Sequence, residues 1–383
     1  MYMKIVYVTP ALYMAGGVER VLTLKANYFA EHFGYDITIV LTEGKGKPLF
    51  YPLSDKIRVV NLGIGFEELW TCPFVKKVFV YLKKQRRFKK LLTAELMRLR
   101  PDITVSMLRR EINFINGIDD GSKKVGEMHV TRANYRNFEA YDSNFFKQIF
   151  SKFWMIQLVG KLKQLDRLIV LTNEDKAAWS ELQNVVAIPD PLSFVPKQFS
   201  TQDVKRVIAV GRYAYEKGFD LLLKAWVAAE KMTKDWRLDI FGDGDRTPYE
   251  KLIDELGIDR SRCELHGRTN DVEHEYCQSS LFVLSSRFEG FGMVITEAMA
   301  CGLPVVAFNC RCGPSSIITH DEDGLLVESG NVGALAQALV RLMSDEMSRR
   351  NFASAGMRNV MRYQIEDIAE TWRRLFEEVV QKD

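Results

Sequence analysis

The 383-residue sequence lacks the features that define several large classes of protein. No apolar run approaches the ~18 residues that a transmembrane helix needs, and no repeat or low-complexity tract occurs, so we expect a soluble or peripheral protein. The six cysteines show no zinc-ligand spacing, and only Cys310 and Cys312 lie close together, so we expect reduced cytosolic thiols. The first residues, including Lys4 and Thr9, lack the long apolar stretch of a secretory signal.

Length and residue pattern together indicate two α/β domains. The chain exceeds the about 250–300 residues at which single hydrophobic cores stop growing, and we expect the boundary near Asp190 and Pro191. Strand-like and helix-like segments alternate on both sides of it, which predicts two parallel, doubly wound sheets. The expected strands are 4–8, 36–41, 102–107, 123–126, 167–171, 206–210, 236–241, 263–265, 281–284 and 304–307, and a helix is expected over 365–380.

The most informative segment begins at Glu289 and ends at Glu297, eight positions later. A helix is expected to begin just after Gly292, and its first N–H groups carry the positive end of the helix dipole, which suits a diphosphate. The two carboxylates would repel phosphates, so we expect them to accept hydrogen bonds from sugar hydroxyls at both ends of that diphosphate. The loop and helix start between them consist of Gly290, Phe291, Gly292, Met293 and Val294.

A second loop supplies positive charge. It follows the expected strand 206–210, contains Gly211, Arg212 and Lys217, and precedes a helix expected over 219–231. Two fixed cations stabilise the negative charge that builds on a departing diphosphate without moving a proton. We therefore predict that Arg212 and Lys217 bind the phosphates of a sugar donor.

These two loops resemble those of retaining glycosyltransferases of family 4, which have the GT-B fold. Glu289 and Glu297 resemble the E-x7-E motif of that family, and the segment from Gly211 to Lys217 resembles its Gly-x-x-x-x-x-Lys-Gly element. The resemblance implies that Glu289 contacts the donor hexose and that Glu297 binds the ribose. It further implies an α/β chain of two Rossmann-like, doubly wound domains facing a cleft. The acceptor-binding domain is then expected at 1–190, the nucleotide-sugar domain at 191–364, and a C-terminal helix, 365–383, returning to the first domain.

The segment Gly242-Asp243-Gly244-Asp245 follows another expected strand. We interpret it as a turn in which the glycines supply positive φ. The Asp-Gly-Asp triplet could be mistaken for the metal-binding Asp-x-Asp sequence of other glycosyltransferases. A metal would be redundant with Arg212, Lys217 and the helix start, so we expect no metal and no cofactor.

Two histidines follow expected strands. His266, with Arg268, resembles the family's loop near the nucleotide base, although the sequence is equally compatible with a packing role for this histidine. His129 follows the expected strand 123–126, and by resemblance it contacts the donor hexose or the acceptor; a packed histidine is the alternative. The family commonly has Glu-His there, whereas this chain places Met128 between Glu127 and His129.

The amino-terminal strand leads into Gly16 and Gly17 at the start of an amphipathic helix. A dinucleotide-binding turn would need a third glycine, and none occurs before Gly34. The segment Gly16-Gly-Val-Glu-Arg20 resembles instead the family's Gly-Gly-x-x-Arg loop, which faces the donor diphosphate.

Positive charge is concentrated in one segment. Residues 74–100 contain ten basic residues and one acid, a balance of +9, so with a formal total of +3 the remaining chain sums to −6. Lys76, Lys83, Arg87 and Lys90 fall on one arc of the expected helix, and apolar residues gather elsewhere on it. Three interpretations compete: a solvated helix face, a nucleic-acid site, or a dock for anionic lipid and a lipid diphosphate acceptor.

We favour the membrane interpretation. The net acidic remainder argues against nucleic acid, and each basic residue near an anionic leaflet contributes about 1 kcal/mol. Some family members that extend undecaprenyl-diphosphate-linked glycans are thought to use a basic helix, which this segment resembles. Six apolar residues near its start are expected to reach the membrane interface: Phe66, Leu69, Trp70, Phe74, Val78 and Phe79.

The sequence therefore predicts a metal-independent, retaining hexosyltransferase on the cytoplasmic, inner face of the cell membrane. It would use a nucleoside diphosphate sugar, with UDP favoured through the resemblance, and a saccharide linked to a polyprenyl diphosphate as acceptor. Two alternatives remain open. One is a sugar-nucleotide epimerase of related fold, and the other is a non-catalytic subunit that binds a nucleotide sugar or glycolipid.

Overall fold

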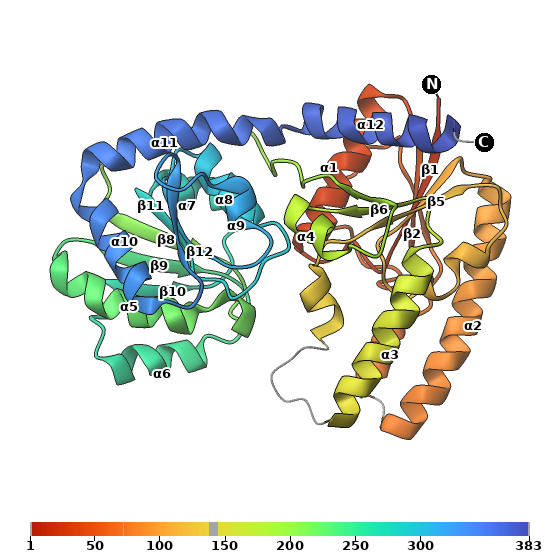
Figure 1. Ribbon diagram of the computed structural model, residues 1–383, viewed down its shortest axis with the longest axis horizontal. Coiled ribbons are helices and arrows are strands. Elements are labelled where there is room, and N and C mark those ends of the chain that lie inside the picture. Colours follow the sequence, from red (N-terminus) through yellow and green to blue (C-terminus); the bar gives the residue numbers. More distant parts are fainter. Residues whose placement is uncertain (1, 72, 138–144, 382–383) are drawn as a thin grey trace. The chain divides into compact units, whose positions relative to one another are not determined.

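Two parallel sheets organise the chain in the computed structural model, which describes residues 2–71, 73–137 and 145–381 (Figure 1). Over these residues, one sheet has seven strands and the other has six. The first sheet belongs to unit 1, Met1–Pro191 with Ile365–Asp383, and the second belongs to unit 2, Leu192–Gln364. All paired strands run parallel, so the carboxyl ends of the strands in each unit lie at one edge of its sheet.

The sheet of unit 1 has the strand order β3-β2-β1-β4-β5-β6-β7. Its central strands are apolar and buried, as is typical of parallel strands covered on both faces. The direction of strand order reverses between β1 and β4, which is where ligands bind in open α/β sheets. The strands are β1 (Lys4–Thr9), β2 (Asp36–Leu41), β3 (Arg58–Asn61), β4 (Ile103–Ser106), β5 (Lys123–Glu127), β6 (Arg167–Val170) and β7 (Val185–Ala187).

Alternation along β1 separates two hydrophobic cores in unit 1. Ile5 and Tyr7 face the core formed with α1 (Gly17–His32) and α12 (Ile365–Gln381), whereas Val6 and Val8 face the core formed with α2 (Phe74–Leu99) and α3 (Phe145–Leu162). The last helix, α12, thus packs on unit 1, with Lys25 of α1 over the ring of its Trp372 at 4.2 Å. A short helix, α4 (Asn173–Ala178), follows β6.

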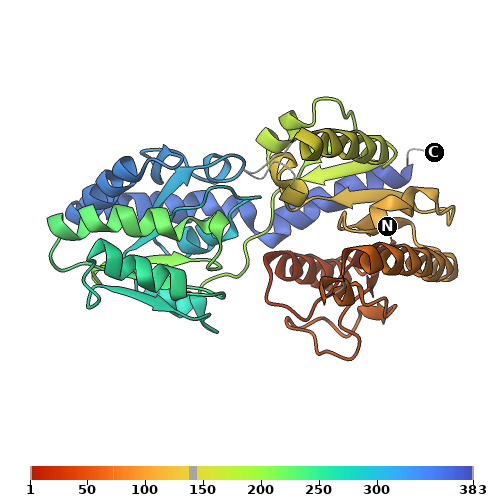
Figure 2. The same ribbon diagram turned by 90° about the horizontal axis from the view of Figure 1, so that it is seen from below.

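Unit 2 is a second doubly wound structure with the strand order β10-β9-β8-β11-β12-β13. Figure 2 shows this unit from below, in colours from green to blue. The order reverses between β8 and β11. Its strands are β8 (Arg206–Val210), β9 (Arg237–Phe241), β10 (Cys263–His266), β11 (Leu281–Leu284), β12 (Val305–Asn309) and β13 (Gly324–Glu328). Its helices are α5 (Phe219–Met232), α6 (Thr247–Leu256), α7 (Val272–Cys277), α8 (Met293–Ala300), α9 (Pro314–Ile317), α10 (Val332–Ser344) and α11 (Glu346–Val360).

The predicted α/β class with two doubly wound parallel sheets is confirmed. Each of the ten strands expected from the sequence is present within one or two residues, and the helix expected after Gly292 begins at Met293. Three short strands, β3, β7 and β13, were not predicted. No helix within the described part of the chain has both the length and the apolar composition needed to cross a bilayer.

Candidate functional site

The point where strand order reverses in unit 2 brings the two predicted donor-binding loops together. β8 and β11 are neighbours in the sheet, and the loops that follow them leave from the same edge. The loop after β8 carries Gly211, Arg212 and Lys217, and the loop after β11 carries Glu289. These segments lie 72 residues apart in the sequence at their point of contact.

An ion pair joins the two loops. The Nζ atom of Lys217 donates to Oε1 of Glu289 at 2.7 Å, and the hydroxyl of Ser286 donates to the same oxygen at 2.6 Å. The side chains of Lys217 and Glu289 are 17% and 10% exposed, so the pair is largely removed from water but still reachable. Desolvation at this level strengthens the attraction of Lys217 for any negative charge placed beside it.

Close packing between the loops depends on Gly218. Its φ is +61°, and a Cβ at this position would lie 2.1 Å from the carbonyl oxygen of Ser285. The hydroxyl of Ser285 donates to the carbonyl of Lys217 at 2.9 Å. Glycine is therefore required both by the backbone conformation and by the space between the loops.

Glycine is required at position 242 for a different reason from the one predicted from the sequence. Gly244 has a φ of +122°, as expected for the turn, but Gly242 does not have positive φ, so the prediction of positive φ for both glycines is wrong at Gly242. A Cβ on Gly242 would lie 1.7 Å from the carbonyl oxygen of Gly211. The strand ends of β8 and β9 approach so closely here that only glycine fits.

The loop after β11 leads directly into the N-terminus of α8. Gly292 is its N-cap residue with a φ of +100°, and Met293 and Val294 in its first turn are half-buried. Glu297 is 4% exposed, and the hydroxyl of Tyr276 donates to its Oε2 at 3.2 Å. Phe291 is 3% exposed and packs edge-on against Tyr363, with 5.3 Å between ring centroids. Its side chain supports the loop from inside.

The other predicted residues of unit 2 are more loosely arranged. The Arg212 side chain is 72% exposed and donates to Glu216 at 2.6 Å, so it is not held beside Glu289 as Lys217 is. The His266 ring stacks on Phe241, with centroids 4.3 Å apart, which is the packing role that the sequence left open. Arg268 lies 3.7 Å from Asp243.

The carboxyl edge of the unit 1 sheet collects a second group of predicted residues. α1 begins at Gly17, and the Glu19 side chain folds back against Gly16. Burial raises the pKa of Glu19, and the positive charges of Arg109 and His129 oppose this rise. Glu19, next to the Gly16–Gly17 turn, is therefore close enough to His129 for their charges to interact.

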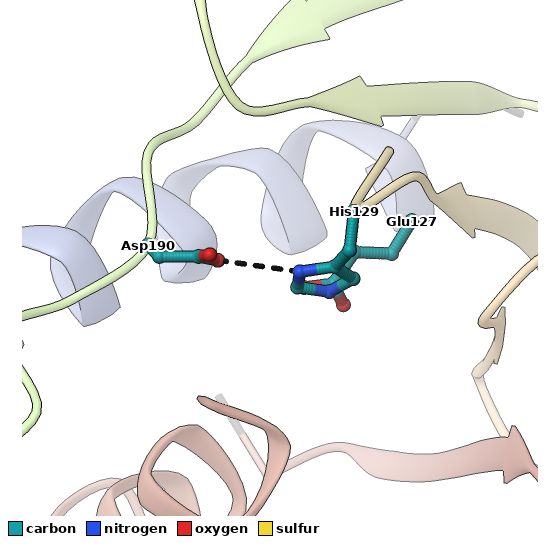
Figure 3. Close-up of side chains that lie close together, drawn as sticks. All are labelled: Glu127, His129 and Asp190. Atoms are coloured by element: carbon teal, nitrogen blue, oxygen red, sulfur yellow. Dashed lines mark hydrogen bonds and ion pairs between the residues drawn. The ribbon is translucent and has the colours of Figure 1, made fainter. Parts of the chain in front are cut away.

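His129 lies between two carboxylates (Figure 3). Its Nε2 is 3.0 Å from Oε1 of Glu127, and its Nδ1 is 3.5 Å from Oδ1 of Asp190. Burial alone would lower the pKa of His129, but the charges of Asp190 and Glu127 raise it to about 9. Burial alone would likewise raise the pKa of Glu127, but Lys25 and His129 lower it to about 2.

Sequence reasoning missed Lys25 and Asp190 as parts of this group. Lys25 is 1% exposed, and its Nζ donates to Oε1 of Glu127. A signal for Lys25 was present, because it falls on the otherwise apolar face of α1 next to Leu22 and Ala26. The sequence marks Asp190 only as the expected domain boundary. The ammonium of Lys25 occupies the position from which a cation would approach Glu127, so this carboxylate already has a positively charged partner.

The basic helix α2 presents its predicted residues to solvent. Lys76, Lys83, Arg87 and Lys90 are exposed, and Phe88, Leu92 and Leu96 on the opposite side are buried in the unit 1 core. Lys84, outside the predicted arc, instead donates to the carbonyls of Ile64 and Gly65, each at 2.7 Å.

Two of the apolar residues expected at a membrane interface are instead buried in the protein. Phe66 and Leu69 are 1% and 3% exposed within the core, so the prediction is wrong for them. Phe79 and Val78 are 72% and 45% exposed and remain available to contact a membrane. The side chains of Trp70 and Phe74 lie outside those that the structure describes.

Comparison with known proteins gives a consistent result. Residues 194–359 match the family model described as Glycosyl transferases group 1. An uncharacterized glycosyltransferase of Haemophilus influenzae is 29% identical over 371 residues, which cover 94% of this chain and 96% of the relative.

A relative from Campylobacter jejuni is 25% identical and covers 98% of this chain and 99% of its own length. It is named GalNAc-α-(1→4)-GalNAc-α-(1→3)-diNAcBac-PP-undecaprenol α-1,4-N-acetyl-D-galactosaminyltransferase. Among solved structures, a mutant of S. aureus TarM in complex with fondaparinux, α-GlcNAc-glycerol and UDP matches with a TM-score of 0.77 and 17% identity. That match covers 98% of this chain and 99% of TarM, and it shows a shared fold.

Proposed function

Because the chain is a glycosyltransferase of the GT-B fold, with a group 1 glycosyltransferase domain in unit 2, we propose that it is a retaining hexosyltransferase. The donor is a nucleoside diphosphate hexose, with UDP as the favoured nucleotide. The acceptor is a saccharide hydroxyl on a membrane-linked glycan, as in the synthesis of bacterial surface polysaccharides or glycoconjugates.

The observation that carries this proposal is the contact between Lys217 and Glu289 beside the start of α8. A diphosphate at the helix N-terminus would lie next to a cation that is already largely desolvated. When the phosphates engage Lys217, Glu289 is free to accept a hydrogen bond from a hydroxyl of the hexose. Ser286 keeps the carboxylate oriented during this exchange, because its hydroxyl donates to the same oxygen.

Glu297 is proposed to hold the nucleotide by its ribose. Its carboxylate is buried beside Tyr276, one turn into α8, so it is fixed in direction. A buried carboxylate gains from accepting hydrogen bonds, and a ribose diol offers two donors. UDP is favoured because the TarM structure of the same fold contains UDP.

The reaction breaks the bond between the hexose C1 and the diphosphate oxygen and forms a bond from C1 to the acceptor oxygen on the same face. A donor phosphate oxygen takes the acceptor proton. Lys217 stabilises the charge that develops on the departing diphosphate, with Arg212 as a second cation. This assignment needs no metal. In unit 1, His129 is proposed to contact the hexose or the acceptor, and Gly16 and Gly17 the diphosphate.

The membrane part of the proposal rests on α2. Its exposed basic residues and the exposed Phe79 suit an anionic leaflet and the diphosphate of a polyprenyl carrier. The name of the Campylobacter jejuni relative specifies an undecaprenol-linked acceptor, which supports a carrier of this class. We therefore propose a peripheral location on the inner face of the cell membrane.

The test is transfer from UDP-hexoses to polyprenyl-diphosphate saccharides, with product anomers identified by NMR. Lys217→Ala should lower turnover by about 10²-fold or more, as for other groups that stabilise developing charge. Lys224→Ala, an exposed lysine on α5 of the same unit, is the matched control and should retain turnover.

Wild-type turnover in Lys217→Ala would contradict the assignment of the donor site. Release of UDP without a transferred product would favour the epimerase alternative. An inverted anomeric product would disprove retention while leaving the transferase assignment intact.

A further inference from the structure

The side chains of Glu127, His129 and Asp190 converge from two separate segments of unit 1 (Figure 3). Glu127 ends β5, His129 follows two residues later, and Asp190 lies in the segment that follows β7. The side chains of Glu127, His129 and Asp190 are 1%, 7% and 7% exposed. These groups therefore interact with little screening by water.

The balance of charges among these buried side chains indicates the protonation state of His129. Two buried carboxylates, Glu127 and Asp190, need two compensating cations, because an unpaired buried charge is costly. Lys25 supplies one through its hydrogen bond to Glu127. A protonated His129 supplies the other, and it can donate from both ring nitrogens at once.

The other charged and titratable groups around His129 are also consistent with a protonated ring. Glu19 of α1 adds a third carboxylate to its surroundings, partly balanced by Arg109. Tyr7 of β1 is fully buried, and its pKa is raised well above the ordinary value by burial and by the charge of Glu127, so it stays neutral. The pKa of His129, raised to about 9, agrees with this balance of charges.

We propose that Asp190 and Glu127 are positioning residues that act through His129, holding its ring between them as a fixed cation for the transfer reaction. This inference rests on the proposed function and deepens it. Since both ring nitrogens carry protons in this arrangement, His129 has no lone pair with which to accept the acceptor's proton. Its contribution is a fixed positive charge, and the proton passes to a donor phosphate oxygen.

The direct test is to titrate His129 by NMR in protein labelled with ¹³C at the histidine ring, with its signal identified by its loss in His129→Gln. In the wild type, the midpoint should lie near 9. Asp190→Asn keeps the shape and removes one carboxylate charge, which should lower the midpoint by about 1–3 pH units. The basic limb of the pH profile of kcat/KM should move by the same amount.

Asp120→Asn is the matched control. Asp120 is a buried carboxylate of unit 1 that is paired with Lys124, and it lies outside the group around His129. Its substitution should leave the His129 midpoint unchanged, even if stability falls. A midpoint that moves equally in both variants would overturn the proposal.

If Asp190→Asn does not fold, the wild-type titration alone still tests the proposal. A midpoint at or below the ordinary value of 6.5 would show that His129 is not held as a cation. Because the titration needs no activity, it is independent of the proposed function. Absence of hexose transfer by the wild type would disprove the function but leave the titration result standing.

Discussion

Substitution of Gly218 by alanine tests whether contact between the two predicted donor-binding loops of unit 2 is required for activity. The added Cβ would lie 2.1 Å from the Ser285 carbonyl oxygen, whereas ordinary contacts begin at 3.4 Å. The segment after β11 must then move by about 1 Å or more. This segment carries Ser286 and Glu289, and a misplacement of about 1 Å near reacting groups can cost about 10²-fold in rate.

The effect of this displacement must be distinguished from the effect of the strained backbone at position 218 itself. Alanine at a φ of +61° costs about 1–2 kcal/mol in stability wherever it occurs. Gly257, which ends α6, has a φ of +66°, and a Cβ there would meet nothing within 4 Å. Gly257→Ala therefore carries the same strain without the clash, and it is a close control.

The assay is kcat/KM for hexose transfer, with unfolding followed by urea titration. We expect Gly257→Ala to lose about 1–2 kcal/mol of stability from the left-handed backbone, and Gly218→Ala to lose more, because its clash adds to the same strain. Only Gly218→Ala should lose about 10²-fold in kcat/KM. Wild-type kcat/KM in Gly218→Ala, or an equal loss in Gly257→Ala, would refute the reasoning.

Two further predictions concern unit 1. Joint replacement of Lys83, Arg87 and Lys90 by alanine should weaken sedimentation with anionic liposomes about a hundredfold, at about 1 kcal/mol per residue, and added salt should weaken wild-type binding. Replacement of Lys231, Lys234 and Lys251, which are exposed on unit 2, is the control, and equal loss in both triple variants would contradict a specific role for α2. The raised pKa of His129 also predicts that its contribution to stability is complete below pH 6.5 and is lost as pH rises through about 9. The difference in unfolding free energy between wild type and His129→Gln should therefore narrow over that range, and a difference that widens would contradict the assignment.

Much of the fold could be predicted because its central strands are apolar runs of ordinary length. β8 and β11 have the bounds expected from the sequence. β7 has only three residues, and β13 begins with a glycine, so neither gives a clear period of apolar residues. These strands form through pairing at the sheet edge, which a local pattern does not encode.

The two predicted donor-binding loops of unit 2 could be singled out from the sequence because Lys217, Glu289 and Glu297 stand at spacings that resemble motifs of a known family. The partners that orient them could not. Ser286 gave no signal because a serine in a polar loop is ordinary, and Tyr276 lies on a different helix from Glu297. Such partners depend on tertiary contacts between segments far apart in the chain.

The most direct test of the central claim is calorimetric titration of UDP, GDP and ADP into the wild type and Glu297→Gln, with a chelator present throughout. Our account predicts that UDP binds without a divalent metal. Loss of a hydrogen-bonded charge at Glu297 should weaken that binding by about tenfold or more. Failure of all three nucleotides to bind, or equal UDP affinity in both proteins, would contradict the nucleotide-sugar site at the start of α8.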